Sequence, residues 1–193
     1  MSQGTSVVTP ERLAQGLTYQ QFIAQITVNH DRFQEFYESA KLTDEDAEFF
    51  RTAVERGACT VLVLGEDWCP DVFRGLPVVA RIAETSNMDI RIFPRDKNLD
   101  IMSEFLKDGQ FQSIPTVVFY NADHEYLGHW IERPNIANIE RAKITEAVKQ
   151  EMAGADDQEI ATEARRRTTE RYPSWQQETV VEIRQLLSER LGI

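Results

Sequence analysis

The order of short apolar runs and helix-like segments is the feature that most constrains the fold of this chain. The run over 60–64 consists of β-branched and aliphatic residues, which predicts a strand buried on both faces. Similar patterns predict strands over 89–93, 114–120 and 125–131, with turn residues before the last one. Helical patterns separate the first three strands, and another follows the fourth. This order predicts an α/β fold with a parallel first half and an antiparallel hairpin at the end.

Helical segments flank the α/β region on its N-terminal side. The spacing of apolar residues predicts three helices there, over 18–26, 31–40 and 43–56. The first begins with a capping-box pair, Thr18 and Gln21. Thr43 and Asp46 form the same kind of pair at the third. The aromatic residues of this region are expected to face the core.

The C-terminal part is helical as well. A helix over 136–152 is followed by a hinge near Gly154, a charged helix over 156–171 and a last helix from Ser174, with Gln177 as its capping partner. Four apolar residues share one face of the last helix, namely Val180, Ile183, Leu187 and Leu191. We expect this face to be buried on the same chain or in a homodimer. The predicted division is therefore an N-terminal extension (1–56), an α/β domain (57–153) and a C-terminal extension (154–193).

The net charge of the chain indicates which classes of binding partner it disfavours. The 193 residues include 21 Lys and Arg and 32 Asp and Glu, which gives a net charge of −11. A negative field repels phosphate backbones and anionic lipids, so we expect neither nucleic acid nor membrane partners. Glutamates flank the arginine triplet at 165–167, which favours a solvated helix face. The apolar runs are of strand length and the N-terminus lacks a secretory pattern, so the expected location is the cytoplasm.

The chain has only two cysteines, Cys59 and Cys69, which limits its disulfide and metal chemistry. Two thiols do not make a disulfide framework, and neither they nor the three histidines have zinc-ligand spacing. About six extended residues at ~3.3 Å each separate the two cysteines along the first strand. A disulfide needs its Cα atoms within about 7 Å, so we predict that they do not pair. The sequence indicates no resident metal or cofactor.

Cys69 is the residue best placed for chemistry. It follows a buried strand and precedes Pro70, which suits the first turn of a helix. A thiol at a helix N-terminus faces unpaired N–H groups and the positive end of the helix dipole, which favours the nucleophilic thiolate. The nearby carboxylate of Asp71 disfavours the thiolate, whereas Arg74 favours it. The sequence leaves the net direction open.

The residues around Cys69 resemble the active-site strand and turn of thioredoxins. The segment 61–71 reads VLVLGEDWCPD, with Trp68 directly before the cysteine. Pro77 stands where thioredoxins carry the proline that kinks the active-site helix, and Ser-Ile-Pro-Thr at 113–116 resembles their cis-proline loop. The resemblance covers 59–152, roughly half of the chain, and is nearest to a bacterial branch with helical additions. It implies a thioredoxin-like three-layer α/β/α sandwich with a mixed central sheet.

The chain departs from the thioredoxin pattern at two positions. Val72 stands where the second cysteine of Cys-x-x-Cys would be, and Val63 stands where thioredoxins place a buried acid. Without a second thiol, a mixed disulfide on Cys69 would need an external thiol to resolve it. The dithiol mechanism of ordinary thioredoxins is therefore not open to this chain.

The resemblance also implies roles for the neighbours of Cys69. The backbone of Ile114 would pair with an extended substrate, Pro115 would shape the groove, and Trp68 and Pro70 would form its apolar rim. One function that follows is a monothiol redox protein acting on a protein or low-molecular-weight thiol or disulfide. The alternative is a binding module that keeps the fold without turnover. A metal or cluster site shared by two chains through Cys69 is a third, but the basic glutathione-binding pattern of such proteins is not recognisable.

Overall fold

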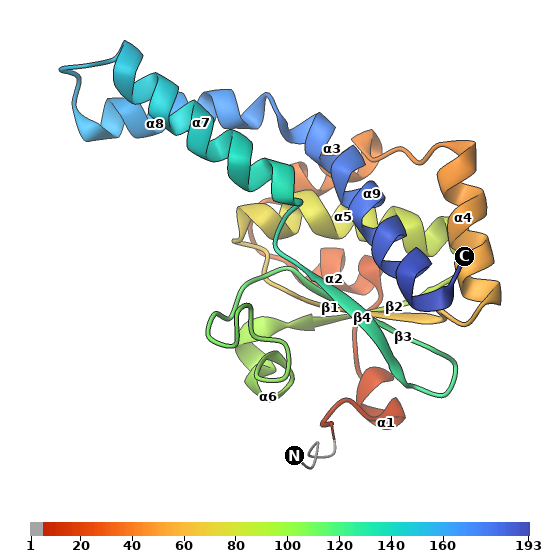
Figure 1. Ribbon diagram of the computed structural model, residues 1–193. Coiled ribbons are helices and arrows are strands. Elements are labelled where there is room, and N and C mark those ends of the chain that lie inside the picture. Colours follow the sequence, from red (N-terminus) through yellow and green to blue (C-terminus); the bar gives the residue numbers. More distant parts are fainter. Residues whose placement is uncertain (1–5) are drawn as a thin grey trace.

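A four-stranded mixed sheet lies at the centre of the computed structural model, which describes residues 6–193 (Figure 1). Its strands are β1 (Thr60–Gly65), β2 (Asp89–Pro94), β3 (Thr116–Tyr120) and β4 (Tyr126–Ile131), in the spatial order β2-β1-β3-β4. β1 pairs parallel with β2 and antiparallel with β3, and β3 pairs antiparallel with β4. The parallel first half and the antiparallel hairpin confirm the predicted fold class.

The two central strands, β1 and β3, are buried along their whole length. Val63 is 0% exposed and lies in register with Ile92 on one side and Val117 on the other. A strand covered on both faces needs apolar residues at successive positions, which is why β1 is recognisable in the sequence as a continuous run. β1 ends at Gly65, and the chain then leads directly to Cys69.

Helices cover both faces of the sheet and give the predicted three layers (Figure 1). The helices around one face are α3 (His30–Ser39), α4 (Asp44–Glu55), α5 (Pro70–Ser86) and α9 (Tyr172–Leu191). The short helices α1 (Pro10–Leu13) and α6 (Leu99–Met102) lie on the other side. α2 (Tyr19–Gln25) packs against β2, and just before it Leu17 adds an antiparallel bridge to Ile92. Both N-terminal capping boxes are present as predicted.

One hydrophobic core includes residues from all three predicted segments. Phe33 and Phe50 from the N-terminal part, Leu62 from β1, and Ile183 and Leu187 from the C-terminal helix are all 0% exposed. The terminal helices therefore complete the core of the α/β region. This explains why the sequence devotes so many aromatic residues to its first 56 positions.

The last helix, α9, lies on the body of its own chain. It contacts α4, α5 and β4, and its Val180, Ile183 and Leu187 are buried there, while Leu191 is half-buried. The apolar face predicted from the sequence is thus covered without a second copy. The predicted start at Ser174 is wrong: α9 begins at Tyr172, because Pro173 fits its first turn.

The two preceding helices behave differently. α7 (Asn135–Glu151) and α8 (Asp157–Thr169) pack on each other as a hairpin that projects from the body (Figure 1). We expected the helix after β4 to complete the α/β domain, but α7 buries only Ala137 and Val148 and makes few contacts with the body. α9 buries more residues than α7 does, and it is α9 that packs against β4 of the sheet.

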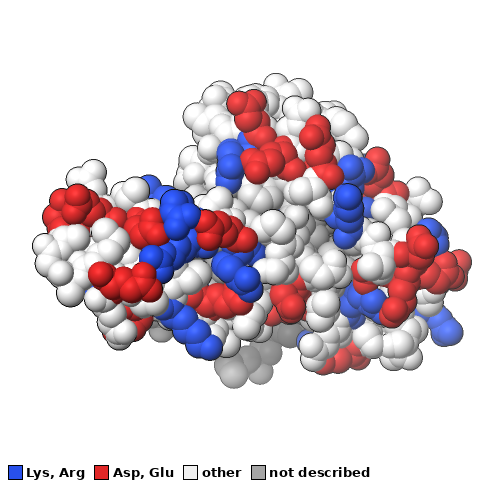
Figure 2. All heavy atoms as spheres, turned by 90° about the horizontal axis from the view of Figure 1, so that it is seen from above, with Lys and Arg blue, Asp and Glu red and all other residues white. Residues whose placement is uncertain are grey.

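The charged side chains of the hairpin pair with each other. Arg166 forms ion pairs with Glu163 and Glu170, and Arg167 with Glu151 and Glu163. Figure 2 shows acidic and basic side chains interleaved along this projecting part. This confirms the interpretation of the arginine triplet as a solvated helix face.

The segment between β2 and β3 is less regular than predicted. The sequence pattern between β2 and β3 predicts a helix that starts at Asn98 or Asp100 and extends through Leu106, but α6 ends at Met102 and follows a 3-10 turn, η1 (Arg95–Lys97). Asn98 is the N-cap residue of α6, but its side chain makes no capping bond, because Oδ1 accepts from Arg12 and Nδ2 donates to the carbonyl of Pro94. In the described part of the chain, no helix has both the length and the apolar character to cross a bilayer.

Candidate functional site

Cys69 occupies the N-cap position of α5, directly after the loop that follows β1. Its carbonyl accepts hydrogen bonds from the N–H groups of Val72 and Phe73, at 3.1 Å each, which form the first turn of the helix. Pro70 takes the first helical position as predicted. The residue is 9% exposed, so the thiol lies just under the surface.

The cis-proline loop lies beside the thiol. The peptide bond between Ile114 and Pro115 is cis, as the resemblance implied. The Cys69 thiol donates to the carbonyl oxygen of Ile114 at 3.7 Å, and both loop residues are buried. Two segments that are 45 residues apart in sequence therefore meet at one sulfur atom.

The surroundings of the thiol disfavour its ionised form. Burial raises the pKa of the Cys69 thiol above its ordinary value, and the Asp71 carboxylate acts in the same direction. The backbone N–H groups of Val72 and Asp71, together with Arg74, lower this pKa, but they do not offset the burial. The helix terminus thus fails to make the thiolate the dominant form, because the sulfur is shielded from water.

The two positions that depart from the thioredoxin pattern are both fully buried. Val72 is 0% exposed and lies against the end of β1, where a Cβ atom added to Gly65 would lie 2.9 Å from its Cγ1. Val63 is 0% exposed in the middle of β1. Neither position provides a thiol or a carboxyl, so the described site holds one reactive side chain, Cys69.

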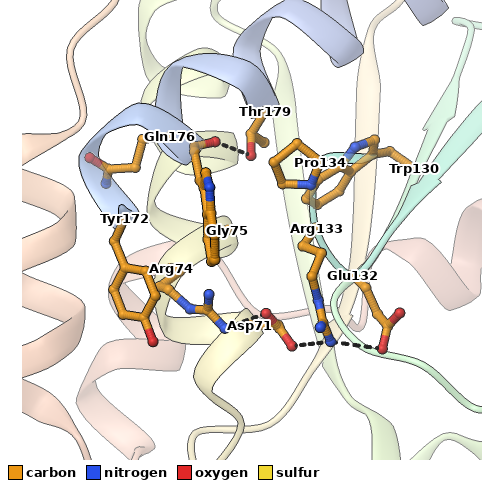
Figure 3. Close-up of a pocket in the computed structure, with 11 residues that line it drawn as sticks. Asp71, Arg74, Gly75, Trp130, Glu132, Arg133, Pro134, Tyr172, Gln176 and Thr179 are labelled. Atoms are coloured by element: carbon orange, nitrogen blue, oxygen red, sulfur yellow. Dashed lines mark hydrogen bonds and ion pairs between the residues drawn. The ribbon is translucent and has the colours of Figure 1, made fainter. Parts of the chain in front are cut away.

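Asp71 sits in the first turn of α5 and is held by two arginines (Figure 3). Its carboxylate forms ion pairs with Arg74 and with Arg133, the latter at 2.6 Å. The guanidinium of Arg74 also lies 4.3 Å from the ring centroid of Tyr172 in α9. The predicted modulators Asp71 and Arg74 are therefore paired with each other and fixed by more distant parts of the chain.

The rim of the site is apolar and open. Trp68 is 51% exposed and Pro70 is exposed as well. The guanidinium of Arg95 lies 5.5 Å from the centroid of the Trp68 ring. Arg95 also donates to the carbonyl of Gln112 at 3.1 Å, and this contact brings the loop before the cis-proline close to the tryptophan.

Cys59 takes no part in this site. It precedes β1, where its N–H donates to the carbonyl of Tyr120, whereas Cys69 follows the other end of the strand. Both cysteines are free thiols, as predicted. Within residues 6–193, no group of three or more His, Cys, Asp or Glu side chains is placed to bind a metal ion.

Sequence reasoning missed three of the residues that shape the site. Arg133 and Glu132 follow β4, and Tyr172 begins α9. All three line a small pocket beside Asp71. Glu132 and Arg133 lie in the stretch 127–134, for which the residue pattern predicted no role.

Comparisons with known proteins agree with this geometry. No curated protein matches the chain. A solved structure of a protein of unknown function from Pseudomonas aeruginosa has 17% identity and a TM-score of 0.65, covering 92% of this chain and 95% of that one. An HIV epitope scaffold has 17% identity and a TM-score of 0.67, covering 96% and 99%. At this identity both show likeness of fold. The thioredoxin family model matches residues 16–149, and a match over most of the chain shows that the protein belongs to the thioredoxin family.

Proposed function

We propose that the protein is a monothiol thiol-disulfide redox protein that uses Cys69. The observation that supports this most is the position of the sulfur, at the N-cap of α5 and 3.7 Å from the carbonyl of Ile114, next to Pro115. An extended chain bound along the Ile114 backbone would bring its disulfide to this sulfur. Trp68 and Pro70, both exposed, would contact its apolar side chains.

The proposed reaction has two balanced steps. The Cys69 thiolate attacks one sulfur of a substrate disulfide, a bond forms between the two sulfurs, and the other substrate sulfur leaves as a thiolate. An external thiolate then attacks the sulfur that was transferred, and Cys69 leaves as a thiolate. The disulfide is exchanged, and no electrons are lost or gained overall. Such a cycle needs a compartment that supplies free thiol, such as the cytoplasm.

The raised pKa of Cys69 sets the expected pH dependence. A thiol with the ordinary cysteine pKa of about 8.5 is roughly 3% thiolate at pH 7. The buried thiol of Cys69 carries less, because its pKa is raised. Because the thiolate is the attacking species, the rate should rise with pH throughout the neutral range and through pH 9. The reaction should be slow at neutral pH and should continue to accelerate where an activated thiol would already have levelled off.

A second candidate is supported by the same burial. A thiol that is shielded from water and lacks a resolving partner also fits a binding module, in which the groove beside Pro115 holds an extended peptide without turnover. In that case Cys69 is a small buried residue of the groove. The two candidates differ in one observable, the covalent modification of Cys69.

Mixed-disulfide formation with glutathione disulfide tests the proposal. We expect intact-mass measurements to show one adduct, absent in Cys69→Ser, retained in Cys59→Ser and removed by added thiol. The yield per minute should increase with pH between about 7 and 9.5, as the thiolate fraction grows. If Cys69 gains no adduct at the alkaline end of this range while free cysteine under the same conditions does, the redox proposal fails and the binding module becomes the better description.

A further inference from the structure

We infer that Arg133 is the positioning residue that joins the thiol-bearing end of α5 to the cis-proline loop and balances the charge next to Cys69. The inference deepens the proposed function and rests on it in that Cys69 is taken as the reacting group. It concerns a residue that lies beyond β4, 62 residues from its partner Asp71. Three sets of contacts give Arg133 this role.

The first set is a pair of contacts made by one nitrogen atom (Figure 3). Nη2 of Arg133 donates to Oδ2 of Asp71 at 2.6 Å and to Oε1 of Glu132 at 3.2 Å. Arg133 and Asp71 retain only 17% and 10% side-chain exposure. Water therefore screens this contact weakly, and the guanidinium holds the first turn of α5 against the loop after β4.

The second set links that loop to the cis-proline. The backbone N–H of Glu132 donates to the carbonyl of Pro115 at 2.7 Å. On its other side Pro115 packs on α5 so closely that a Cβ atom added to Gly75 would lie 3.3 Å from the proline ring. The contacts thus close a ring from α5 through Arg133 and Glu132 to Pro115 and back to α5. A displacement of Arg133 would loosen the contact between the Cys69 thiol and the cis-proline loop.

The third set concerns charge. Asp71 and Glu132 each have a second cationic partner, Arg74 and Lys107. Arg74, Asp71, Arg133, Glu132 and Lys107 therefore form a continuous row of five alternating charges, with one cation in excess. Without Arg133 the row would be neutral, and the carboxylate in the same helical turn as the thiol would be less compensated. Less compensation disfavours the thiolate.

The other acidic groups near the thiol have partners of their own. Glu66, in the loop before Cys69, accepts the N–H of Asp96 at 2.7 Å. Asp67 accepts the N–H groups of Thr27 and Val28. The charge next to the start of α5 is therefore set by the row that contains Arg133, and a single substitution in this row changes it.

The chemistry of Arg133 also predicts which replacement will preserve its role. Both of its contacts use Nη2, whereas Nε is buried and has no partner among the described residues. A lysine would keep one cationic nitrogen for the two carboxylates and would remove the unpaired N–H group. We expect Arg133→Lys to preserve the reactivity of Cys69 and Arg133→Gln to reduce it.

The test is the pH–rate profile of iodoacetamide alkylation at Cys69, measured on the full chain by peptide mass spectrometry with Cys59 as internal reference. A shift of about one unit in the pKa of a thiol changes its thiolate fraction about tenfold at a pH below that pKa. We expect Arg133→Gln to slow Cys69 at about pH 8 by roughly 3- to 10-fold and Asp71→Asn to accelerate it by a similar factor. The double variant should return to within about twofold of the wild type.

A matched control separates this effect from simple destabilisation. Arg184 also bridges two carboxylates, of Glu45 and Asp46, but it joins α9 to α4 away from the thiol. Arg184→Gln should lower the melting temperature without shifting the Cys69 profile, and Arg133→Lys should keep the wild-type profile. The inference is overturned if Arg133→Gln folds and its Cys69 profile matches the wild type, or if Arg184→Gln shifts it equally. Alkylation needs no disulfide substrate, so failure of glutathione exchange would count against the proposed function and leave this test intact.

Discussion

Restoring a second thiol at position 72 is the perturbation that tests the interpretation of the site most directly. Positions 69 and 72 are the N-cap and N3 residues of α5 and lie on one face of its first turn. Cα atoms three residues apart in a helix are separated by about 5 Å. A disulfide accepts Cα separations of about 4.4–6.8 Å, so the new thiol of Val72→Cys should bond to Cys69 under oxidising conditions with small adjustments.

The cost of the substitution can be estimated from the burial of Val72. The side chain is 0% exposed and packs on Gly65, so a smaller cysteine fits without a clash. Losing roughly one buried methyl group should reduce the free energy of unfolding of the reduced protein by about 1 kcal/mol. For a chain of this length that corresponds to a fall of about 2–4 °C in melting temperature.

Insulin reduction with dithiothreitol as the electron source measures the gain. We expect the wild type to remain at background, because a mixed disulfide on Cys69 has no neighbouring thiol to displace the substrate, and Val72→Cys to reduce insulin measurably. The control is Val72→Cys combined with Cys69→Ser, which keeps the new thiol and removes the old one. If Val72→Cys folds and forms the disulfide between positions 69 and 72 but stays at background, the assignment of this turn as a redox site is wrong.

Three further predictions concern the helices that complete the core. Leu187→Ala should cost about 2–5 kcal/mol in urea unfolding, because Leu187 is 0% exposed between α9 and the body; a cost below about 1 kcal/mol would show that α9 packs loosely. Truncation after Gly154 removes α9 and should yield an insoluble or non-cooperatively unfolding chain; an unchanged melting temperature would contradict the shared core. Burial alone would raise the pKa of Asp46, but hydrogen bonds from Thr43 and Arg184 hold it below its usual range. The stability that Asp46 contributes should therefore be complete above about pH 4 and lost as the pH falls further, and Asp46→Asn should flatten that part of the acid unfolding curve.

The local features of this fold could be predicted from the sequence because the interactions that create them join residues close together in the chain. The pair Thr18 and Gln21 caps its helix through contacts three residues apart. The approach of a buried strand to Cys69 and the start of α5 at Pro70 are likewise properties of one continuous segment. A run without charged residues marks β1 because both of its faces are covered.

Other features depend on which surfaces meet, and the sequence alone left them open. Whether α7 or α9 would cover the sheet depends on the area that each can bury, and α9 buries seven residues where α7 buries two. The direction of the thiol pKa depends on the depth of burial of Cys69, since desolvation outweighs the helix N–H groups and Arg74. The depth at which the Cys69 sulfur lies is set by the packing of the whole molecule, so the sequence alone does not give it.

The same distinction applies to the candidate site. The reactive thiol, the cis-proline loop and the missing second thiol at Val72 are all visible in the order of residues, since each is a residue type at a set spacing along the chain. Their surroundings arise only when the chain folds. Arg133 reaches Asp71 from the far end of the sheet hairpin, and a contact across 62 residues leaves no periodic or spacing signal because it exists only when the two segments are folded together.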